Sequence, residues 1–177
     1  MKRVSSKTVY EGKIARVRVD KFIHPDGSTV TREVVGHPGA VAIVPYDEQH
    51  MFMVRQPREA VGEEALLELP AGKLDVPGES PLECAKRELA EEIGKAASEW
   101  RELKRFFTTP GFADEEVTLY LATGLEDASV EPADEEERLE IVPWPLAELD
   151  AAIEECRDSS SLIGMLLFRD LRDSGDA

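Results

Sequence analysis

GKLDVPGESPLECAKRELAEEIGK, residues 72–95, is the segment from which the rest of this 177-residue chain can be interpreted. Ser80, followed by Pro81 and then by Glu83, has the spacing of a capping box, which predicts that a helix begins at Pro81. Apolar residues recur at helical spacing up to Gly94, and glycine is favoured just beyond the C-terminal end of a helix. The segment is therefore expected to form a loop followed by one capped, amphipathic helix.

Three carboxylates share one face of this predicted helix. Glu88, Glu91 and Glu92 stand at positions i, i+3 and i+4, so their side chains project in one direction. Two carboxylates about 6 Å apart repel by roughly 3 kcal/mol at an effective dielectric constant near 20. If this face lines a cleft, it needs a cation, and oxygen ligands of this kind suit Mg²⁺ or Mn²⁺, which also bind substrate phosphates.

The composition narrows the class of protein. The net charge is −16, with 42% hydrophobic and 33% charged residues, which fits a globular domain and argues against partners such as nucleic acid or an anionic membrane. The two cysteines form no CxxC pair, so we expect neither a zinc site nor a disulfide framework, and we interpret Cys84 as a packing residue. The N-terminus has no apolar leader and no run of about 18 apolar residues occurs, so a cytoplasmic location is expected.

The remaining chain alternates predicted strands and helices. Residues 7–36 have the pattern of an antiparallel pair that turns at residues 25–27. Further strands are predicted at 40–46, 51–56, 65–69, 100–108, 117–122 and 141–144, and helices at 145–156 and 160–172. Strands and helices in this order favour an α/β sandwich with a mixed sheet.

The helical segment resembles the Nudix box, which reads Gly, five residues, Glu, seven residues, and then Arg-Glu-aliphatic-any-Glu-Glu-any-Gly-aliphatic. The defined positions are filled by Gly72, Glu79, Arg87, Glu88, Leu89, Glu91, Glu92 and Gly94. The chain departs from the pattern twice: six residues separate Gly72 from Glu79, which leaves the role of Glu79 open, and Lys95 stands at the final aliphatic position.

Other segments look like the ADP-ribose pyrophosphatase branch of this superfamily. They are residues 37–41, 54–56, 68–72 and 109–115, with Pro110 sixteen residues beyond Gly94. The resemblance implies a Nudix-type α/β/α sandwich with a mixed central sheet at residues 38–177. It also implies an N-terminal antiparallel hairpin at residues 1–37, exchanged between the subunits of a homodimer. The implied activity is hydrolysis of ADP-ribose to AMP and ribose 5-phosphate, with Mg²⁺ or Mn²⁺ as cofactor.

The resemblance also assigns the groups that would carry the chemistry. Glu88 and Glu92 would be metal ligands, joined by Glu91 and by the backbone carbonyl of Ala71. Arg87 would fix the glutamates through ion pairs, with Glu68 and, one helical turn on, Glu91 as the two partners considered.

The general base is expected on the acidic segment 134–141. Its register before Trp144 favours Glu137, with Glu135 and Glu136 as competitors, although most carboxylates of such a run are simply solvated.

The implied substrate-binding residues are spread along the chain. Arg58 is a candidate contact for the diphosphate, and Phe112 with Glu115 for the terminal ribose. Arg32 and Glu33 would reach the partner's adenosine site, although both also suit an exposed, salt-bridged hairpin. The full set is Arg32, Glu33, Arg58, Glu68, Phe112 and Glu115.

Three other functions compete with ADP-ribose hydrolysis. The box serves only the metal and the diphosphate, so a pyrophosphatase for another nucleoside diphosphate sugar fits it equally. A nucleoside triphosphatase is disfavoured by the Pro110 segment and the N-terminal hairpin. A non-catalytic sensor of ADP-ribose is disfavoured by the intact glutamates of the helix.

Overall fold

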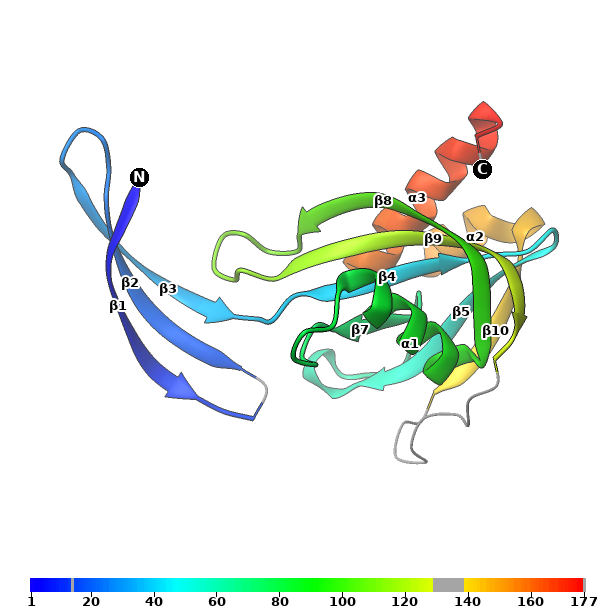
Figure 1. Ribbon diagram of the computed structural model, residues 1–177, viewed down its shortest axis with the longest axis horizontal. Coiled ribbons are helices and arrows are strands. Elements are labelled where there is room, and N and C mark those ends of the chain that lie inside the picture. Colours follow the sequence, from blue (N-terminus) through cyan, green and yellow to red (C-terminus); the bar gives the residue numbers. More distant parts are fainter. Residues whose placement is uncertain (14, 129–138, 177) are drawn as a thin grey trace. The chain divides into compact units, whose positions relative to one another are not determined.

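The computed structural model describes residues 1–13, 15–128 and 139–176. Two compact units are present: residues 1–39 with 106–116, and residues 40–105 with 117–177. Figure 1 shows the elements that make up each of them. In the described part of the chain, no helix is long and apolar enough to cross a membrane.

The smaller unit is built on a three-stranded antiparallel sheet in the order β1 (Lys2–Glu11), β2 (Arg16–Ile23) and β3 (Thr29–Gly36). The β2–β3 pair is the predicted hairpin, and its turn is closed by a bond from Gly27 N–H to the His24 carbonyl. Strand β1 was not anticipated. Nine of its ten side chains are exposed, so it lacks the alternation of buried and exposed residues that reveals a strand in a sequence.

A loop that follows β8 is attached to this sheet. Val35 N–H donates to the Phe112 carbonyl (2.8 Å), and Asp114 N–H donates to the Val35 carbonyl (3.2 Å). Arg18 bridges Asp20 (2.9 Å) and Asp114 (2.7 Å). Burial acts to raise the pKa of Asp114, but the bonds from His37 N–H and Arg18 outweigh it, and the pKa is lowered. The loop is thus held by both backbone and ionic contacts.

The larger unit contains two sheets. One has the order β7 (Ala71–Lys73), β4 (Ala40–Pro45), β9 (Glu116–Asp127) and β8 (Lys95–Phe107). The other has the order β10 (Glu140–Pro145), β5 (His50–Arg58) and β6 (Glu63–Glu68), with the short helix η1 (Glu59–Val61) after β5. Because β4 pairs parallel with β9 and antiparallel with β7, the expected mixed sheet is confirmed.

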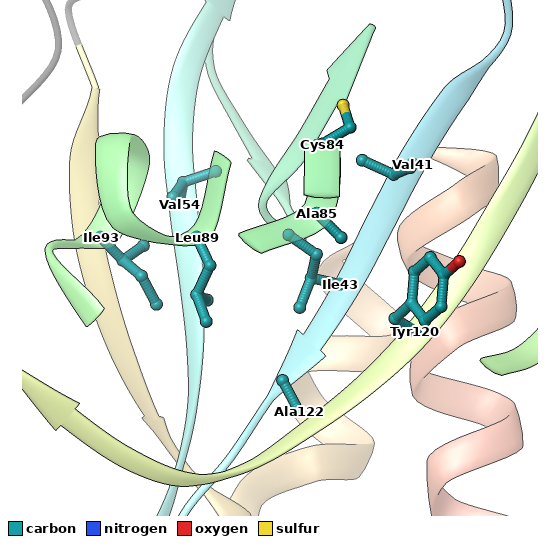
Figure 2. Packing of buried hydrophobic residues seen from close by; sticks show 9 residues of the cluster. All are labelled: Val41, Ile43, Val54, Cys84, Ala85, Leu89, Ile93, Tyr120 and Ala122. Atoms are coloured by element: carbon teal, nitrogen blue, oxygen red, sulfur yellow. The ribbon is translucent and has the colours of Figure 1, made fainter. Parts of the chain in front are cut away.

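Helices pack on both faces of the first sheet. Val41 and Ile43 on β4 belong to a cluster with Leu89 of α1 (Pro81–Ile93), as Figure 2 shows. The next residue, Val44, faces α3 (Ser159–Ser174), where a Cβ on Gly164 would lie 3.2 Å from its methyl carbon. The short helices η2 (Leu146–Glu148) and α2 (Leu149–Glu155) precede α3. This alternation confirms the α/β/α sandwich and explains why every residue of β4 after Ala40 is buried.

Helix α1 has the boundaries that its sequence predicts. The Ser80 hydroxyl accepts Glu83 N–H (3.3 Å), and the Glu83 carboxylate accepts Ser80 N–H (2.8 Å), which completes the capping box. Gly94 ends the helix with φ of 65°, a left-handed conformation that suits glycine. Leu89 is fully buried, which contributes about 2 kcal/mol and fixes the rotation of the helix. The acidic face is thereby oriented away from the core.

Candidate active site

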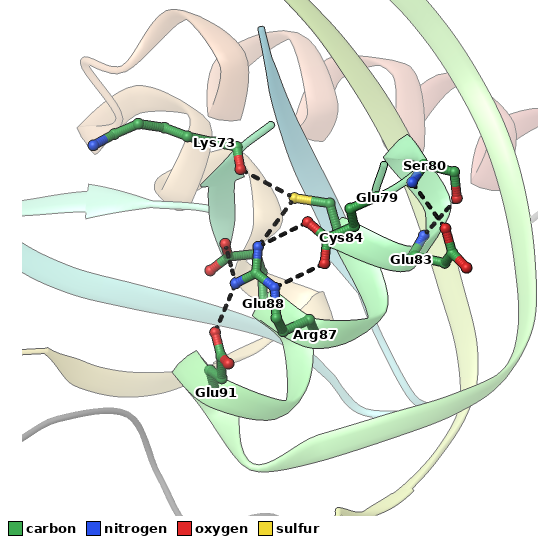
Figure 3. Close-up of polar contacts among 8 residues, drawn as sticks. All are labelled: Lys73, Glu79, Ser80, Glu83, Cys84, Arg87, Glu88 and Glu91. Atoms are coloured by element: carbon green, nitrogen blue, oxygen red, sulfur yellow. Dashed lines mark hydrogen bonds and ion pairs between the residues drawn. The ribbon is translucent and has the colours of Figure 1, made fainter. Parts of the chain in front are cut away.

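Arg87 organises the acidic face of α1 (Figure 3). Its guanidinium donates to both oxygens of Glu79 (2.9 and 3.1 Å), and its Nη1 donates to Glu88 (2.8 Å) and Glu91 (2.8 Å). The pairing with Glu91 is the one expected at one helical turn. Glu68, the other partner considered for Arg87, is instead held by Arg58.

These contacts give Glu79 a defined place. The hydrogen bonds that Glu79 accepts from Arg87 lower the pKa of Glu79. The same bonds to Glu79 are the largest cause of the raised pKa of Arg87, and the bond to Glu91 adds to it. Both groups are therefore ionised at neutral pH. The residue inserted before Glu79 is accommodated by a turn in which Gly78 adopts a φ of 85° and Glu79 N–H donates to the Val76 carbonyl.

Glu88 and Glu92 converge on the backbone of β7. A Cβ placed on Gly72 would lie 2.0 Å from the Glu88 carboxylate, so only a glycine leaves room for that side chain. Glu92 Oε2 accepts Ala71 N–H at 3.0 Å. Glu88 and Glu92, one helical turn apart on α1, thus lie against the backbone of two consecutive residues of β7.

The strand pairing determines which way Ala71 faces. Ile43 N–H donates to the Pro70 carbonyl (2.9 Å), and Ala42 pairs with Ala71 in the next position of the ladder. Hydrogen-bonded and non-hydrogen-bonded pairs alternate along an antiparallel ladder, so the N–H and carbonyl of Ala71 face away from β4. The carbonyl therefore lies on the side from which Glu92 approaches.

This donor set fits a divalent cation that prefers oxygen. Residues 1–13, 15–128 and 139–176 contain no preassembled cluster of three His, Cys, Asp or Glu side chains for a metal. The physical reason is that Arg87 engages Glu88 and Glu91, while Glu92 accepts a backbone N–H. Mg²⁺ takes one or two carboxylates and completes its shell with water or substrate oxygens, so two carboxylates beside a backbone carbonyl suffice.

Cys84 lies beside this network without joining its chemistry. The thiol is fully buried and contacts the Lys73 carbonyl at 3.4 Å. Burial, followed by the nearby charge of Glu88, raises the pKa of the thiol to about 12. It therefore stays protonated and fills space, in agreement with its interpretation as a packing residue.

Arg58, the last residue of β5, and Glu68, the last residue of β6, form a second ionic pair. Glu68 is only 4% exposed and accepts from Arg58 Nε (2.8 Å) and Nη2 (2.5 Å) and from Gln56 (3.0 Å). The bond to Glu68 raises the pKa of Arg58, whose side chain remains 45% exposed. The guanidinium is thus fixed in orientation yet accessible.

The smaller unit contains the other substrate-binding candidates. The side chain of Arg32 donates to the Thr31 carbonyl (2.9 Å), and Glu33 pairs with Val19 across the β2–β3 ladder. Phe112 is 58% exposed, and Glu115 accepts from the Thr108 hydroxyl (2.5 Å) and lies 3.4 Å from His37. Glu137 and its competitors Glu135 and Glu136 lie outside the described residues.

Two family models together match most of the chain. The model for the NUDIX domain matches residues 36–161, and the model for the nucleoside diphosphate sugar hydrolase N-terminal domain matches residues 1–35. An ADP-ribose pyrophosphatase of Mycobacterium tuberculosis (strain ATCC 25618 / H37Rv) is 48% identical over 147 residues, covering 82% of this chain and 70% of that protein.

Two further relatives cover still more of the chain. A methanol dehydrogenase activator of Bacillus methanolicus is 38% identical over 168 residues, covering 93% of this chain and 90% of that protein. A crystal structure of an ADP compounds hydrolase has a TM-score of 0.83 at 27% identity, covering 99% of this chain and 96% of that one. Because the NUDIX model spans both sheets of the larger unit and the glutamate-bearing helix, this chain belongs to the Nudix family.

Proposed function

We propose that this chain hydrolyses the diphosphate bond of ADP-ribose and releases AMP and ribose 5-phosphate. One observation carries the proposal: Glu88 and Glu92 converge on the Ala71–Gly72 backbone, beside a guanidinium that already holds Glu88. The substrate is inferred from the M. tuberculosis relative and from the structural neighbour, whose names refer to ADP-ribose and ADP compounds. This Nudix enzyme is accordingly a pyrophosphatase.

We propose Mg²⁺ as the cofactor, with Mn²⁺ as a substitute. Glu88, Glu92 and the Ala71 carbonyl would hold it, and Glu91 is the next available carboxylate. A bound divalent cation supplies positive charge that stabilises the phosphate oxygens as the P–O bond breaks. Arg87 holds the carboxylates close together and oriented, which is an electrostatic preorganisation of the site.

The protein groups would then orient the reactants and move one proton. Arg58 would contact the diphosphate with the accessible part of its guanidinium, while buried Glu68 acts through Arg58 by fixing it. Water attacks one phosphorus, the bond to the bridging oxygen breaks, and the other phosphate leaves with its sugar. We propose that Glu137 takes the proton of that water. Glu137→Gln should lower kcat about 10²- to 10⁴-fold, whereas Glu135→Gln and Glu136→Gln should not.

The N-terminal residues suit a role in recognising the ends of the substrate. Arg32 and Glu33 would bind the adenosine part in a partner subunit, and Phe112 with Glu115 would border the terminal ribose. A homodimer with exchanged N-terminal segments follows from this proposal. Light scattering at working concentration should give the dimer mass, and a monomer would exclude the shared site.

A substrate panel tests the function directly. Purified protein is supplied with Mg²⁺ and ADP-ribose, GDP-mannose or a nucleoside triphosphate, and the products are separated by chromatography. We expect AMP and ribose 5-phosphate from ADP-ribose as the preferred reaction. ADP-ribose binding without product would favour a sensor, and a preference for GDP-mannose would favour another nucleoside diphosphate sugar.

Glu92→Gln is the matched variant for the metal site. Glutamine keeps a carbonyl oxygen that can accept Ala71 N–H, so the fold should persist while the charge is lost. Turnover should disappear in this variant and remain in the exposed control Glu64→Gln. Wild-type turnover in Glu92→Gln would remove Glu92 from the set of metal ligands.

A further inference from the structure

A buried serine in the first turn of α3 connects two segments that are distant in sequence. Ser161 is 1% exposed, and its hydroxyl accepts Leu69 N–H at 2.8 Å. The same hydroxyl donates to Asp158 Oδ2 at 2.7 Å, and Ser161 N–H donates to that oxygen at 2.8 Å. Asp158 is the N-cap residue of α3, so the hydroxyl is oriented by the group that begins the helix.

The bond from Leu69 belongs to a set that fixes three consecutive residues. Leu69 N–H is held by Ser161 of α3, the Pro70 carbonyl by Ile43 of β4, and Ala71 N–H by Glu92 of α1. Each bond comes from a different element of the sandwich. The segment between β6 and β7 is thus constrained from three directions.

The closeness of α3 to this segment strengthens the constraint. A Cβ on Gly164, one turn after Ser161, would lie 2.5 Å from Leu69 Cδ1. Leu69 is itself only 1% exposed, so its N–H is shielded from bulk solvent and depends on the serine for its hydrogen bond. The ring of Pro70, which lies between Leu69 and Ala71, fixes its own φ angle and so leaves few free dihedral angles between Leu69 N–H and the carbonyl of Ala71.

We propose that Ser161 is a positioning residue for the cation site, because it holds Leu69 N–H and thereby sets the position of the Ala71 carbonyl. This inference rests on the proposed function, in which that carbonyl binds the divalent cation. The hydroxyl has two roles that alanine cannot fill, since it accepts from Leu69 and donates to Asp158. Capping of α3 uses the Asp158 carboxylate and Ser161 N–H, so it does not need the hydroxyl.

Binding of Mn²⁺ alone to the full chain, measured by titration calorimetry well below the melting temperature, tests the proposal. Ser161→Ala should bind Mn²⁺ about 10-fold more weakly than wild type, the effect expected for loss of a group that supports a ligand. Ser161→Cys retains a weaker acceptor and should give an intermediate affinity. Ser159→Ala, at an exposed serine of the same turn, should match wild type.

The possible outcomes separate the inference from the function on which it rests. A purely structural role would lower the melting temperature of Ser161→Ala while leaving its Mn²⁺ affinity at the wild-type value, and that result would overturn the inference. If Ser161→Ala does not fold, wild-type affinity in Ser161→Cys would overturn it equally. A wild-type chain that binds no Mn²⁺ would overturn both the inference and the proposed metal site.

Discussion

Gly72→Ala should reduce catalysis by displacing a single carboxylate. The backbone of Gly72 does not adopt a positive φ, so alanine is tolerated there without strain in the main chain. The new Cβ would instead lie 2.0 Å from the Glu88 carboxylate carbon, whereas ordinary contact begins at 3.4 Å. Glu88 must therefore retreat by about 1.4 Å, and a displacement of about 1 Å in a catalytic site can cost 10²-fold in rate.

The same displacement breaks the contact between Glu88 and Arg87. A hydrogen bond between charged groups contributes about 2 kcal/mol, which corresponds to a fall of about 4–8 °C in melting temperature for a chain of this size. We would measure kcat for ADP-ribose hydrolysis and the melting temperature by calorimetry. Gly111→Ala is the control, because a Cβ there meets nothing within 4 Å. If kcat of Gly72→Ala stayed within twofold of wild type, the placement of Glu88 in the reaction would be refuted.

Two further predictions concern Arg87 and the two cysteines. Arg87→Met should lower the free energy of unfolding by about 2 kcal/mol in urea titrations, whereas Arg169→Met, which loses an exposed pair, should lower it by under about 0.5 kcal/mol. Arg87 lowers the pKa of Glu79. Their pairing therefore stabilises the fold fully at pH values above 4.5, the ordinary pKa of a glutamate, and this stabilisation is lost as the pH falls through the lowered pKa. The difference between wild type and Arg87→Met should accordingly narrow in acid, and a constant difference down to pH 3 would contradict the pairing. Burial raises the pKa of Cys84 to about 12 and of Cys156 to about 11, so at pH 8 about one thiol in 10⁴ and one in 10³ is ionised. Neither should react with Ellman's reagent until the chain is unfolded in guanidinium, and rapid labelling of the native protein would show that these thiols are not buried.

The helix could be predicted from the sequence because its determinants are local. The capping box and the C-terminal glycine act within a few residues, and the pair Arg87–Glu91 spans a single turn. The acidic face could be predicted equally well, because its prediction needs only the period of an α-helix. Such local features do not depend on how the rest of the chain is arranged, and this is why their prediction agrees with the structure.

The remaining features depend on residues that are distant in sequence. Leu69, whose N–H donates to the Ser161 hydroxyl, is 92 residues away from it, so no local pattern pointed to this bond. Strand β1 is held by its ladder with β2 and carries no apolar period. Glu79 kept an open role because spacing alone could not show that the chain would turn back at Gly78 toward Arg87.

The position of Arg87 explains how α1 and the loop before it can carry so many carboxylates. Glu79, Glu88, Glu91 and Glu92 with this one guanidinium leave a formal charge of −3. Without Arg87, each close carboxylate pair would repel by roughly 3 kcal/mol, and the side chains would move apart into water. Because the guanidinium lies on the same helix, it offsets that repulsion locally and does not depend on a bound ion. The residual charge is large enough to attract a divalent cation, and the carboxylates that would bind it are already oriented by α1 and β7.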